Sequence, residues 1–249
     1  LSNLKTLPKP HGFKVAMFPI KIEGGAGGWA RAVAIEGEGT LTKKPEILDL
    51  SVPLMAEAME GAYYQNRIDH FTHVEEARKF AKMFGLNLDL LPSPEFYAND
   101  FVSIPSHAGT HLDAPWHFGP MAEGKPAKTA DQLPLEWCYG DGVLLDFSHK
   151  KPNDPISVVE LMKELERIGY DLKPGNIVLI RTGAEEHYFT DPNFCEVATG
   201  LSGDALMWLF GRGIRTMGTD SFTLDISIQI MSQKLKAGDR AAYFPVHCG

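Results

Sequence analysis

Cysteine is scarce in this sequence, and its distribution gives no sign of a disulfide framework. The three cysteines, Cys138, Cys195 and Cys248, are far apart, and no C-x-x-C pair occurs. Widely spaced thiols in odd number are typical of a protein in a reducing compartment. We therefore expect a cytoplasmic protein.

Long apolar runs and basic runs are also missing. No stretch approaches the roughly 20 apolar residues that span a bilayer, and the first 30 residues carry no basic segment followed by an apolar one. The net charge is -8, without a cluster of Lys or Arg. These absences argue against membrane and nucleic-acid partners. A small-molecule substrate is the expected partner.

Several catalytic motifs are absent as well. There is no G-x-S-x-G for a serine-hydrolase elbow and no H-E-x-x-H for a zinc protease. The glycine-rich run at residues 24–28 is not followed by Gly-Lys-Ser/Thr, so we interpret it as turns and not as a phosphate-binding loop.

What is present fits an ordinary globular protein of one domain. The 249 residues are 44% hydrophobic and 22% charged, which is typical of a chain with one sizeable core. We expect residues 1–46 to form an N-terminal arm of loops and short strands, and residues 47–249 to form the main domain. The sequence leaves open whether that domain is complete at its C-terminal end.

Three segments carry the pattern of capped helices. Thr72 and Glu75 form a capping box ahead of an apolar stripe that ends at Gly85, and Ser157 and Glu160 repeat this pattern before Gly169. A third helix is expected to begin after Ser202.

Short β-branched and apolar runs predict strands between and after these helices. They lie at residues 47–52, 142–147, 177–181, 214–217 and 241–246. The alternation predicts an α/β fold with flanking helices, while the strand order stays open. Asp220, at the end of one expected strand, is interpreted as a turn residue, with a place near the pocket as the alternative. Residues 54–105 are long for a simple connection, so we expect them to supply a lid or a partner contact.

The informative segment is S-H-A-G-T-H-L-D-A-P-W-H-F at residues 106–118. Its central 11 residues hold three of the nine histidines, where chance predicts about 0.4. Gly109, Thr110 and Pro115 oppose a helix here, so we expect a turn that runs into a strand. His111 and Asp113 then share one face, and the turn folds His107 toward them.

Two imidazoles and one carboxylate suit Zn²⁺ or Mn²⁺, and three protein ligands leave a position open for catalysis. From the residues alone, a packed or solvated histidine cluster stays an equal alternative.

The pattern H-x-G-T-H-x-D-x-P-x-H-F resembles the signature of the putative cyclase family, which includes bacterial kynurenine formamidases and isatin hydrolase. Asp49, Leu50 and Ser51 are similar to the family's early Asp-Leu-Ser, and residues 171–183 resemble its later Gly-Asp-x-Val-Leu-Ile-x-Thr-Gly region. The resemblance extends over about residues 47–249 and is strong only at the signature. It implies a cyclase-like swivelling β/β/α fold with a mixed sheet, and usually a homodimer or a higher homo-oligomer.

The resemblance also implies site residues. A divalent metal would lie on His107, His111 and Asp113, with Zn²⁺ preferred and Mn²⁺ as the alternative, and His117 would have a catalytic or second-metal role. His247 resembles a later metal-binding histidine of the family, although a capped strand end is the alternative for it. The glutamate that follows this histidine in the family falls outside the 249 residues. The number of metal ions in the site, one or two, therefore stays open.

The expected function is a metal-dependent hydrolase that cleaves an amide, formamide or cyclic amide of a small aromatic molecule through metal-activated water. His117 would handle the proton, and Trp116 and Phe118 would contact the substrate. The alternatives are a metal-dependent cyclase or lactone hydrolase with the same centre, and a metal-bearing binding protein without turnover.

Overall fold

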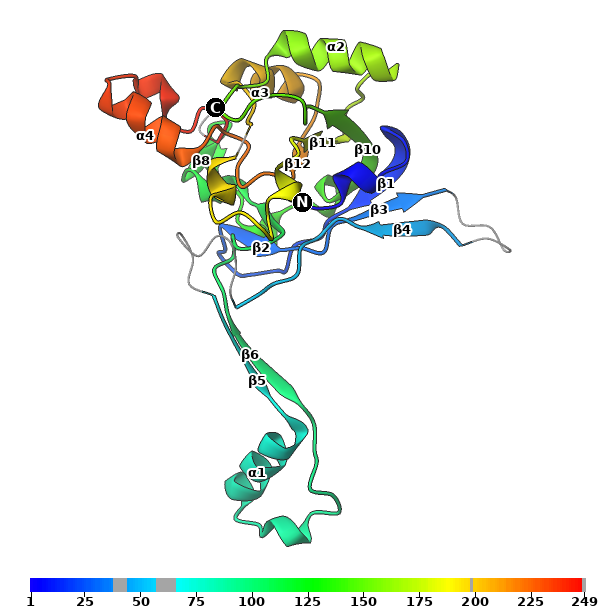
Figure 1. Ribbon diagram of the computed structural model, residues 1–249, viewed down its shortest axis with the longest axis vertical. Coiled ribbons are helices and arrows are strands. Elements are labelled where there is room, and N and C mark those ends of the chain that lie inside the picture. The colour runs from blue at the N-terminus through cyan, green and yellow to red at the C-terminus, as the bar shows by residue number, and fades with distance from the viewer. Residues whose placement is uncertain (38–43, 57–65, 198, 248–249) are drawn as a thin grey trace.

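The computed structural model describes residues 1–37, 44–56, 66–197 and 199–247. The main body is built on a six-stranded sheet in the order β12-β11-β10-β1-β3-β4. The three strands β10, β11 and β12 run parallel, whereas β10, β1, β3 and β4 pair antiparallel. Their bounds are β1 His11–Ala16, β3 Val33–Glu36, β4 Glu46–Asp49, β10 Tyr139–Asp146, β11 Ile177–Arg181 and β12 Thr216–Thr219. The predicted α/β fold with a mixed sheet and flanking helices is confirmed (Figure 1).

The sheet buries both of its faces, and the alternation along β10 explains how. Val143 and Leu145 point into a core shared with α2 (Val158–Ile168) and α3 (Gly203–Phe210). Leu144 points to the opposite core, where it meets residues of β1, β3 and the N-terminal segment. Successive side chains of a strand lie on opposite faces, so an apolar run can serve two cores.

The three capped helices are confirmed. The capping boxes of Thr72 with Glu75 and of Ser157 with Glu160 open α1 (His73–Phe84) and α2, and Ser202 caps α3. A fourth helix, α4 (Ile228–Lys236), was not anticipated from the sequence. None of the helices in the described part of the chain has the length and apolar character needed to cross a membrane.

Two strands of the N-terminal 46 residues lie inside the sheet. β1 separates β10 from β3, and β3 separates β1 from β4. The segment therefore contributes to the core as well as carrying loops. Its glycine-rich run leads into β2 (Gly27–Trp29), which pairs outside the main sheet.

The strand expected over residues 241–246 is wrong. A 3-10 turn covers Arg240–Ala242, and Phe244 has a positive φ of 40°, which a strand does not tolerate. The backbone N–H of Val246 donates to the side chain of Asp225 and not to a neighbouring strand.

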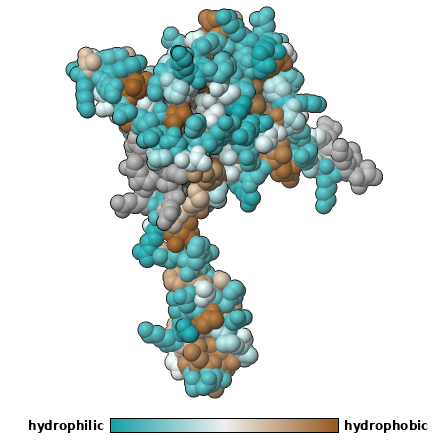
Figure 2. Space-filling view, viewed as in Figure 1, coloured by the Kyte–Doolittle hydropathy of each residue, from teal (hydrophilic) through white to brown (hydrophobic). Residues whose placement is uncertain are grey.

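A long arm leaves the body between residues 66 and 103 (Figure 1). It consists of the antiparallel pair β5 (Arg67–Phe71) and β6 (Asn99–Ser103), with α1 at its far end. All five residues of β6 are exposed. Brown apolar surface gathers near the tip of this arm (Figure 2). It belongs to the region 54–105 for which a lid or partner contact was expected; residues 57–65 of that region lie outside the described residues.

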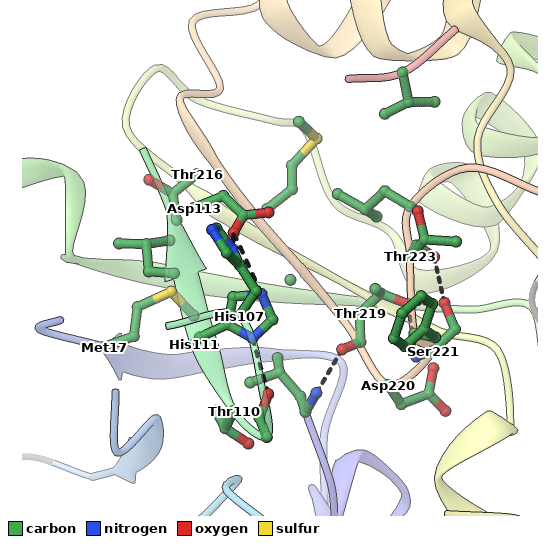
Figure 3. A pocket seen from close by; sticks show the side chains of 18 of the residues that line it. Met17, His107, Thr110, His111, Asp113, Thr216, Thr219, Asp220, Ser221 and Thr223 are labelled. Atoms are coloured by element: carbon green, nitrogen blue, oxygen red, sulfur yellow. Dashed lines mark hydrogen bonds and ion pairs between the residues drawn. The ribbon is translucent and has the colours of Figure 1, made fainter. Parts of the chain in front are cut away.

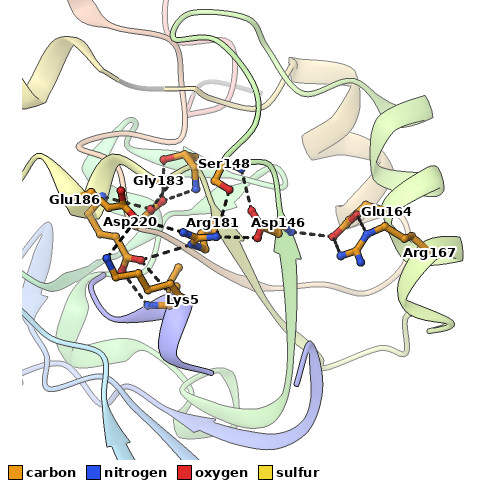
Figure 4. A network of polar contacts seen from close by, with 12 residues as sticks. Lys5, Asp146, Ser148, Glu164, Arg167, Arg181, Gly183, Glu186 and Asp220 are labelled. Atoms are coloured by element: carbon orange, nitrogen blue, oxygen red, sulfur yellow. Dashed lines mark hydrogen bonds and ion pairs between the residues drawn. The ribbon is translucent and has the colours of Figure 1, made fainter. Parts of the chain in front are cut away.

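The carboxyl ends of β10 and β11 are joined by a polar network (Figure 4). Asp220 is buried and accepts hydrogen bonds from the backbone N–H groups of Thr182 and Gly183. Arg181 pairs with Asp146 across the two strands at 2.8 Å. The carboxylate of Asp220 thus holds the loop that follows β11.

Candidate metal centre

The signature segment forms the predicted turn and strand. Gly109 has a φ of 65°, a conformation that favours glycine, and β7 (His111–Asp113) follows it directly. β7 pairs antiparallel with β2, which places Gly27 opposite Asp113 and Trp29 opposite His111. β2 and β7, which are far apart in the sequence, therefore lie side by side at the site.

Side chains near the turn fix its position against the body. The hydroxyl of Thr110 accepts a hydrogen bond from the backbone N–H of Val52 at 2.9 Å. The indole N–H of Trp29 donates to the carbonyl oxygen of Pro105 at 2.9 Å. These bonds secure the chain on both sides of His107, so the histidine is held and not left on a free loop.

His107, His111 and Asp113 converge as the sequence predicts (Figure 3). Nδ1 of His107 lies 2.7 Å from Oδ1 of Asp113, and Nε2 of His111 lies 3.3 Å from the same oxygen. The rings of His107 and His111 meet edge to face, with centroids 5.2 Å apart. All three side chains are partly buried at this point of the surface.

The hydrogen bonds of His111 reveal which of its nitrogens is free. Nδ1 lies 2.9 Å from the carbonyl oxygen of Gly109, which can only accept, so Nδ1 carries a hydrogen. In the neutral ring Nε2 then presents a lone pair toward the carboxylate of Asp113. Two electron-rich atoms face each other, and a positive charge is needed there, either on the ring or as a cation held by both groups.

The charge balance of the centre points the same way. Burial alone lowers the pKa of His111, but the hydrogen bond and charge of Asp113 outweigh it and raise this pKa above its ordinary value. Burial alone raises the pKa of Asp113, but hydrogen bonds from His107 and His111 hold it far below the usual range. The site therefore favours an ionised carboxylate surrounded by positive charge.

His117 joins the cluster from the 3-10 turn Pro115–His117, which begins where β7 ends. Its ring stacks on His107, with centroids 3.9 Å apart and planes inclined by 24°. Ligand atoms of His107, Asp113 and His117 all lie within 4.8 Å of one another, close enough to hold one metal ion. Burial lowers the pKa of His117 to about 4, with nearby imidazoles adding to the effect, so the ring is neutral at neutral pH.

His247 reaches the centre from the other end of the chain. Its Nε2 lies 4.0 Å from Oδ2 of Asp113, and its Nδ1 contacts the carboxylate of Asp225. The structure thus brings together the side chains of all five residues singled out as catalytic or metal-binding: His107, His111, Asp113, His117 and His247.

The two aromatic residues of the signature lie differently from the histidines. Trp116 is 43% exposed, and neither it nor Phe118 lines the adjoining cavity. Phe118 packs against the rings of His117 and His247, with centroid distances of 4.6 and 4.4 Å. Its contacts support the imidazoles, and its predicted contact with a substrate stays a prediction.

A cavity of about 290 Å³ opens beside His107, His111 and Asp113. Its far wall follows the end of β12 and carries the side chains of Thr219, Ser221 and Thr223 (Figure 3). Aromatic side chains of Tyr188 and Phe222 also line it. Apart from Asp220, for which a place near the pocket was the alternative interpretation, this wall was not predicted, because only the parallel pairing of β11 with β12 brings residues 219–223 next to the signature. The short run Gly218-Thr219-Asp220 was its one visible signal.

A family model described as "Putative cyclase" matches residues 48–226, which is well over half of the chain. The chain belongs to the putative cyclase family. The family membership expected from the signature at residues 106–118 is thereby confirmed.

Solved structures with the same fold include cyclases and isatin hydrolases. A crystal structure of a novel cyclase aligns with a TM-score of 0.50 at 22% identity over 66% of this chain and 62% of its own. An isatin hydrolase bound to the product analogue thioisatinate aligns with a TM-score of 0.53 at 18% identity, over 73% of this chain and 63% of its own. Isatin hydrolase A from Ralstonia solanacearum aligns with a TM-score of 0.53 at 20% identity, over 74% of this chain and 64% of its own.

These likenesses establish the fold of this cyclase-family chain. In each pair the alignment spans less than two thirds of the solved chain's length. A search of curated protein sequences gave no significant match. Activity and substrate are therefore argued from the site itself.

Proposed function

We propose that this protein is a metal-dependent hydrolase that cleaves an amide, formamide or cyclic amide bond of a small aromatic molecule. The observation that carries the proposal is the arrangement around Asp113. Nε2 of His111 and Nε2 of His247 both face its carboxylate, while the Nδ1 atoms of the two rings are engaged elsewhere. Such rings are oriented to share a cation with the carboxylate.

The donor set fits a divalent ion of the zinc type. Two ligand atoms bound at about 2.1 Å to one tetrahedral ion lie roughly 3.4 Å apart. Nε2 of His111 and Oδ1 of Asp113 are 3.3 Å apart. Imidazole nitrogens with one carboxylate suit Zn²⁺ and also Mn²⁺. We propose Zn²⁺ as the resident ion, with Mn²⁺ as the alternative.

When bound, such an ion lowers the pKa of a coordinated water to about 7 and polarises a carbonyl group. The protein's own groups would do the rest. The neutral imidazole of His117, stacked beside His107, would accept the proton of the attacking water at its free nitrogen and return it to the leaving nitrogen. The cavity of about 290 Å³ with its aromatic side chains has room for a small ring.

Two other functions are compatible with the same centre. A metal-dependent cyclase or lactone hydrolase would need the same activated water or carbonyl. The name of the family is the reason to retain this alternative. A binding protein that holds the metal without turnover is the second. The structural neighbours named isatin hydrolase favour the hydrolase over both.

Metal binding and turnover can be tested together. Metal-free protein is titrated with Zn²⁺ and Mn²⁺ against a chelator, alongside Asp113→Asn, and each loaded form is offered formanilides, isatin and lactones. We expect stoichiometric binding by the wild type, and an affinity for Asp113→Asn lower by more than about 100-fold, the upper range for loss of an outer-shell partner. Hydrolysis of an amide supports the proposal. Binding with no hydrolysis identifies the binding protein, and hydrolysis of lactones alone identifies the rival enzyme.

We further propose that the protein is a homodimer and that the arm, residues 66–103, is where the second copy binds. Met83, Phe84, Leu90 and Phe101 are each more than half exposed on it. A lone two-stranded ribbon is at best marginally stable in water, and its open edges accept further strands. Two arms related by a two-fold axis would cover each other's apolar surface. The cytoplasmic location stays a prediction.

A further inference from the structure

Asp225 is a buried carboxylate whose two oxygens are both engaged by the segment that carries His247. The residue has no exposed surface. Its Oδ1 accepts the backbone N–H of Val246 at 2.8 Å, and its Oδ2 contacts Nδ1 of His247 in a short hydrogen bond. The same side chain thus holds both the backbone and the ring of the last histidine.

Asp225 itself is rigidly placed. It lies between the end of β12 and the N-cap of α4, Ser227, and its backbone N–H donates to the hydroxyl of Thr223 at 3.1 Å. Gly200 packs directly against it, since a β-carbon on Gly200 would lie 2.3 Å from the carbonyl carbon of Asp225. Only glycine permits this approach, so the backbone that carries the carboxylate is closely packed at this point.

The hydrogen bond to Asp225 decides what His247 can do. An ionised carboxylate only accepts, so Nδ1 of His247 carries the hydrogen and the neutral ring keeps its lone pair on Nε2. That nitrogen is the one that faces Oδ2 of Asp113, at 4.0 Å. The ring is carried by the turn after the Arg240–Ala242 segment, where no strand or helix is assigned among the described residues. The contact with Asp225, and not a helix or strand, therefore orients the ring of His247.

We propose that Asp225 is a positioning residue, which fixes the orientation and the tautomer of His247 so that Nε2 faces the metal centre. The inference rests on the proposed function in one respect, that the centre takes up a divalent cation. Asp225 touches neither Asp113 nor the other signature histidines in the hydrogen bonds of the described residues.

Replacing Asp225 by asparagine separates this role from simple packing. The amide has nearly the shape of the carboxylate but only one acceptor oxygen. If that oxygen keeps the N–H of Val246, the NH₂ group faces Nδ1 of His247 and forces the hydrogen onto Nε2. If the amide flips, the N–H of Val246 loses its buried acceptor and the turn is released. In the first case Nε2 of His247 loses its lone pair; in the second the tautomer persists, but the released turn no longer holds Nε2 toward Asp113.

The first measurement needs no metal. In the metal-free protein labelled with ¹⁵N-histidine, we expect His247 to carry its hydrogen on Nδ1. In Asp225→Asn we expect the hydrogen to move to Nε2 or, with the amide flipped, the signals of His247 to broaden as the ring is released. A wild-type ring with its hydrogen on Nε2 overturns the proposal. This result does not depend on whether the protein is a hydrolase, and the wild-type spectrum serves even if the variant fails to fold.

The second measurement is Zn²⁺ affinity by chelator competition. We expect Asp225→Asn to bind Zn²⁺ about 10- to 100-fold more weakly, the range for outer-shell partners of metal-bound histidines. Once His247→Ala is in place, adding Asp225→Asn should cause no further loss, because the two residues act through one contact. Wild-type affinity in Asp225→Asn, or losses that simply add in the double variant, overturn the proposal.

Glu164→Gln is the matched control. Glu164 is also a buried carboxylate, but it pairs with Arg167 and accepts the backbone N–H of Asp146 (Figure 4), and it does not line the cavity beside the proposed metal centre. We expect Glu164→Gln to have a lower melting temperature than the wild type, while its Zn²⁺ affinity and the spectrum of His247 stay unchanged. A wild-type protein that binds no Zn²⁺ would contradict the proposed function, and the tautomer of His247 would still decide the role of Asp225.

Discussion

Gly27 lies so close to His107 that a β-carbon on it would be 2.9 Å from Cε1 of the imidazole and 3.3 Å from Oδ1 of Asp113. The glycine belongs to β2, which pairs with β7 directly beneath the metal centre. This part of the glycine-rich run is therefore required by the close approach of two strands at the ligands, and not by a turn alone.

A first prediction concerns this contact. Gly27→Ala should lower the Zn²⁺ affinity by about 10-fold, because His107 and Asp113 must move apart to admit the methyl group, and outer-shell changes cost on this scale. Chelator competition measures the effect. Gly119→Ala is a suitable control, since a β-carbon there meets its nearest atom at an ordinary 3.6 Å. Equal affinities of Gly27→Ala and wild type would show that the ligands are not in contact with β2 in solution.

A second prediction separates the two roles of His117. His117→Ala should reduce kcat by about 100-fold or more, the usual contribution of a proton-transferring side chain, while the metal content stays near that of the wild type. Metal analysis and steady-state kinetics on the same preparation decide this. Loss of the metal together with activity would instead make His117 a ligand, which its place within 4.8 Å of the other donors also permits.

A third prediction concerns stability and pH. Partial burial alone raises the pKa of Glu160, but hydrogen bonds from Lys150 and Ser157 outweigh it and lower this pKa to about 2. Because the folded value lies below the ordinary 4.5, the stabilisation is present above that ordinary value and is lost as pH falls toward 2. Glu160→Gln should therefore lower the free energy of unfolding by about 1 kcal/mol at pH 7, a modest figure for a partly exposed cap.

Urea unfolding of wild type and Glu160→Gln at several pH values checks this sign. The difference between the two proteins should shrink steadily between pH 5 and pH 2. A difference that is constant across this range would mean that the charge of Glu160 contributes nothing to the cap of α2.

A fourth prediction addresses the arm. Replacing both Phe84 and Phe101, which are 61% and 56% exposed, by glutamate should convert the dimer into a monomer, since burying two unpaired charges in an interface is strongly unfavourable. Light scattering during gel filtration gives the mass. Exchanging Val159, which is 59% exposed on α2, for glutamate should leave the dimer intact. A wild type that is monomeric at micromolar concentration would contradict the assignment of the arm.

The sequence predicted the features that depend on neighbours in the chain. Capping boxes are local, so Thr72 and Ser157 located the starts of α1 and α2. The turn and strand at residues 107–113 were likewise set by Gly109 and the alternation after it. Because His107, His111 and Asp113 need only this local geometry, most of the centre could be predicted without knowing the fold.

Features that depend on distant contacts could not be predicted in this way. The run Ala241–Val246 has the composition of a strand, yet none of the strands in the described part of the chain pairs with it, and Asp225 accepts the N–H of Val246 instead. Asp225 carries no local signal of its role, because only the folded chain brings it into contact with Val246 and His247. The wall at residues 219–223 required the order of β10, β11 and β12, which no local pattern contains.

Anomalous diffraction from crystals grown with Zn²⁺, recorded on both sides of the zinc absorption edge, tests the central claim most directly. We expect one strong peak within bonding distance of His111 Nε2 and Asp113 Oδ1, with His107 turned to the same ion. Crystals whose peak lies elsewhere, or in which these side chains surround no ion at saturating Zn²⁺, would contradict it.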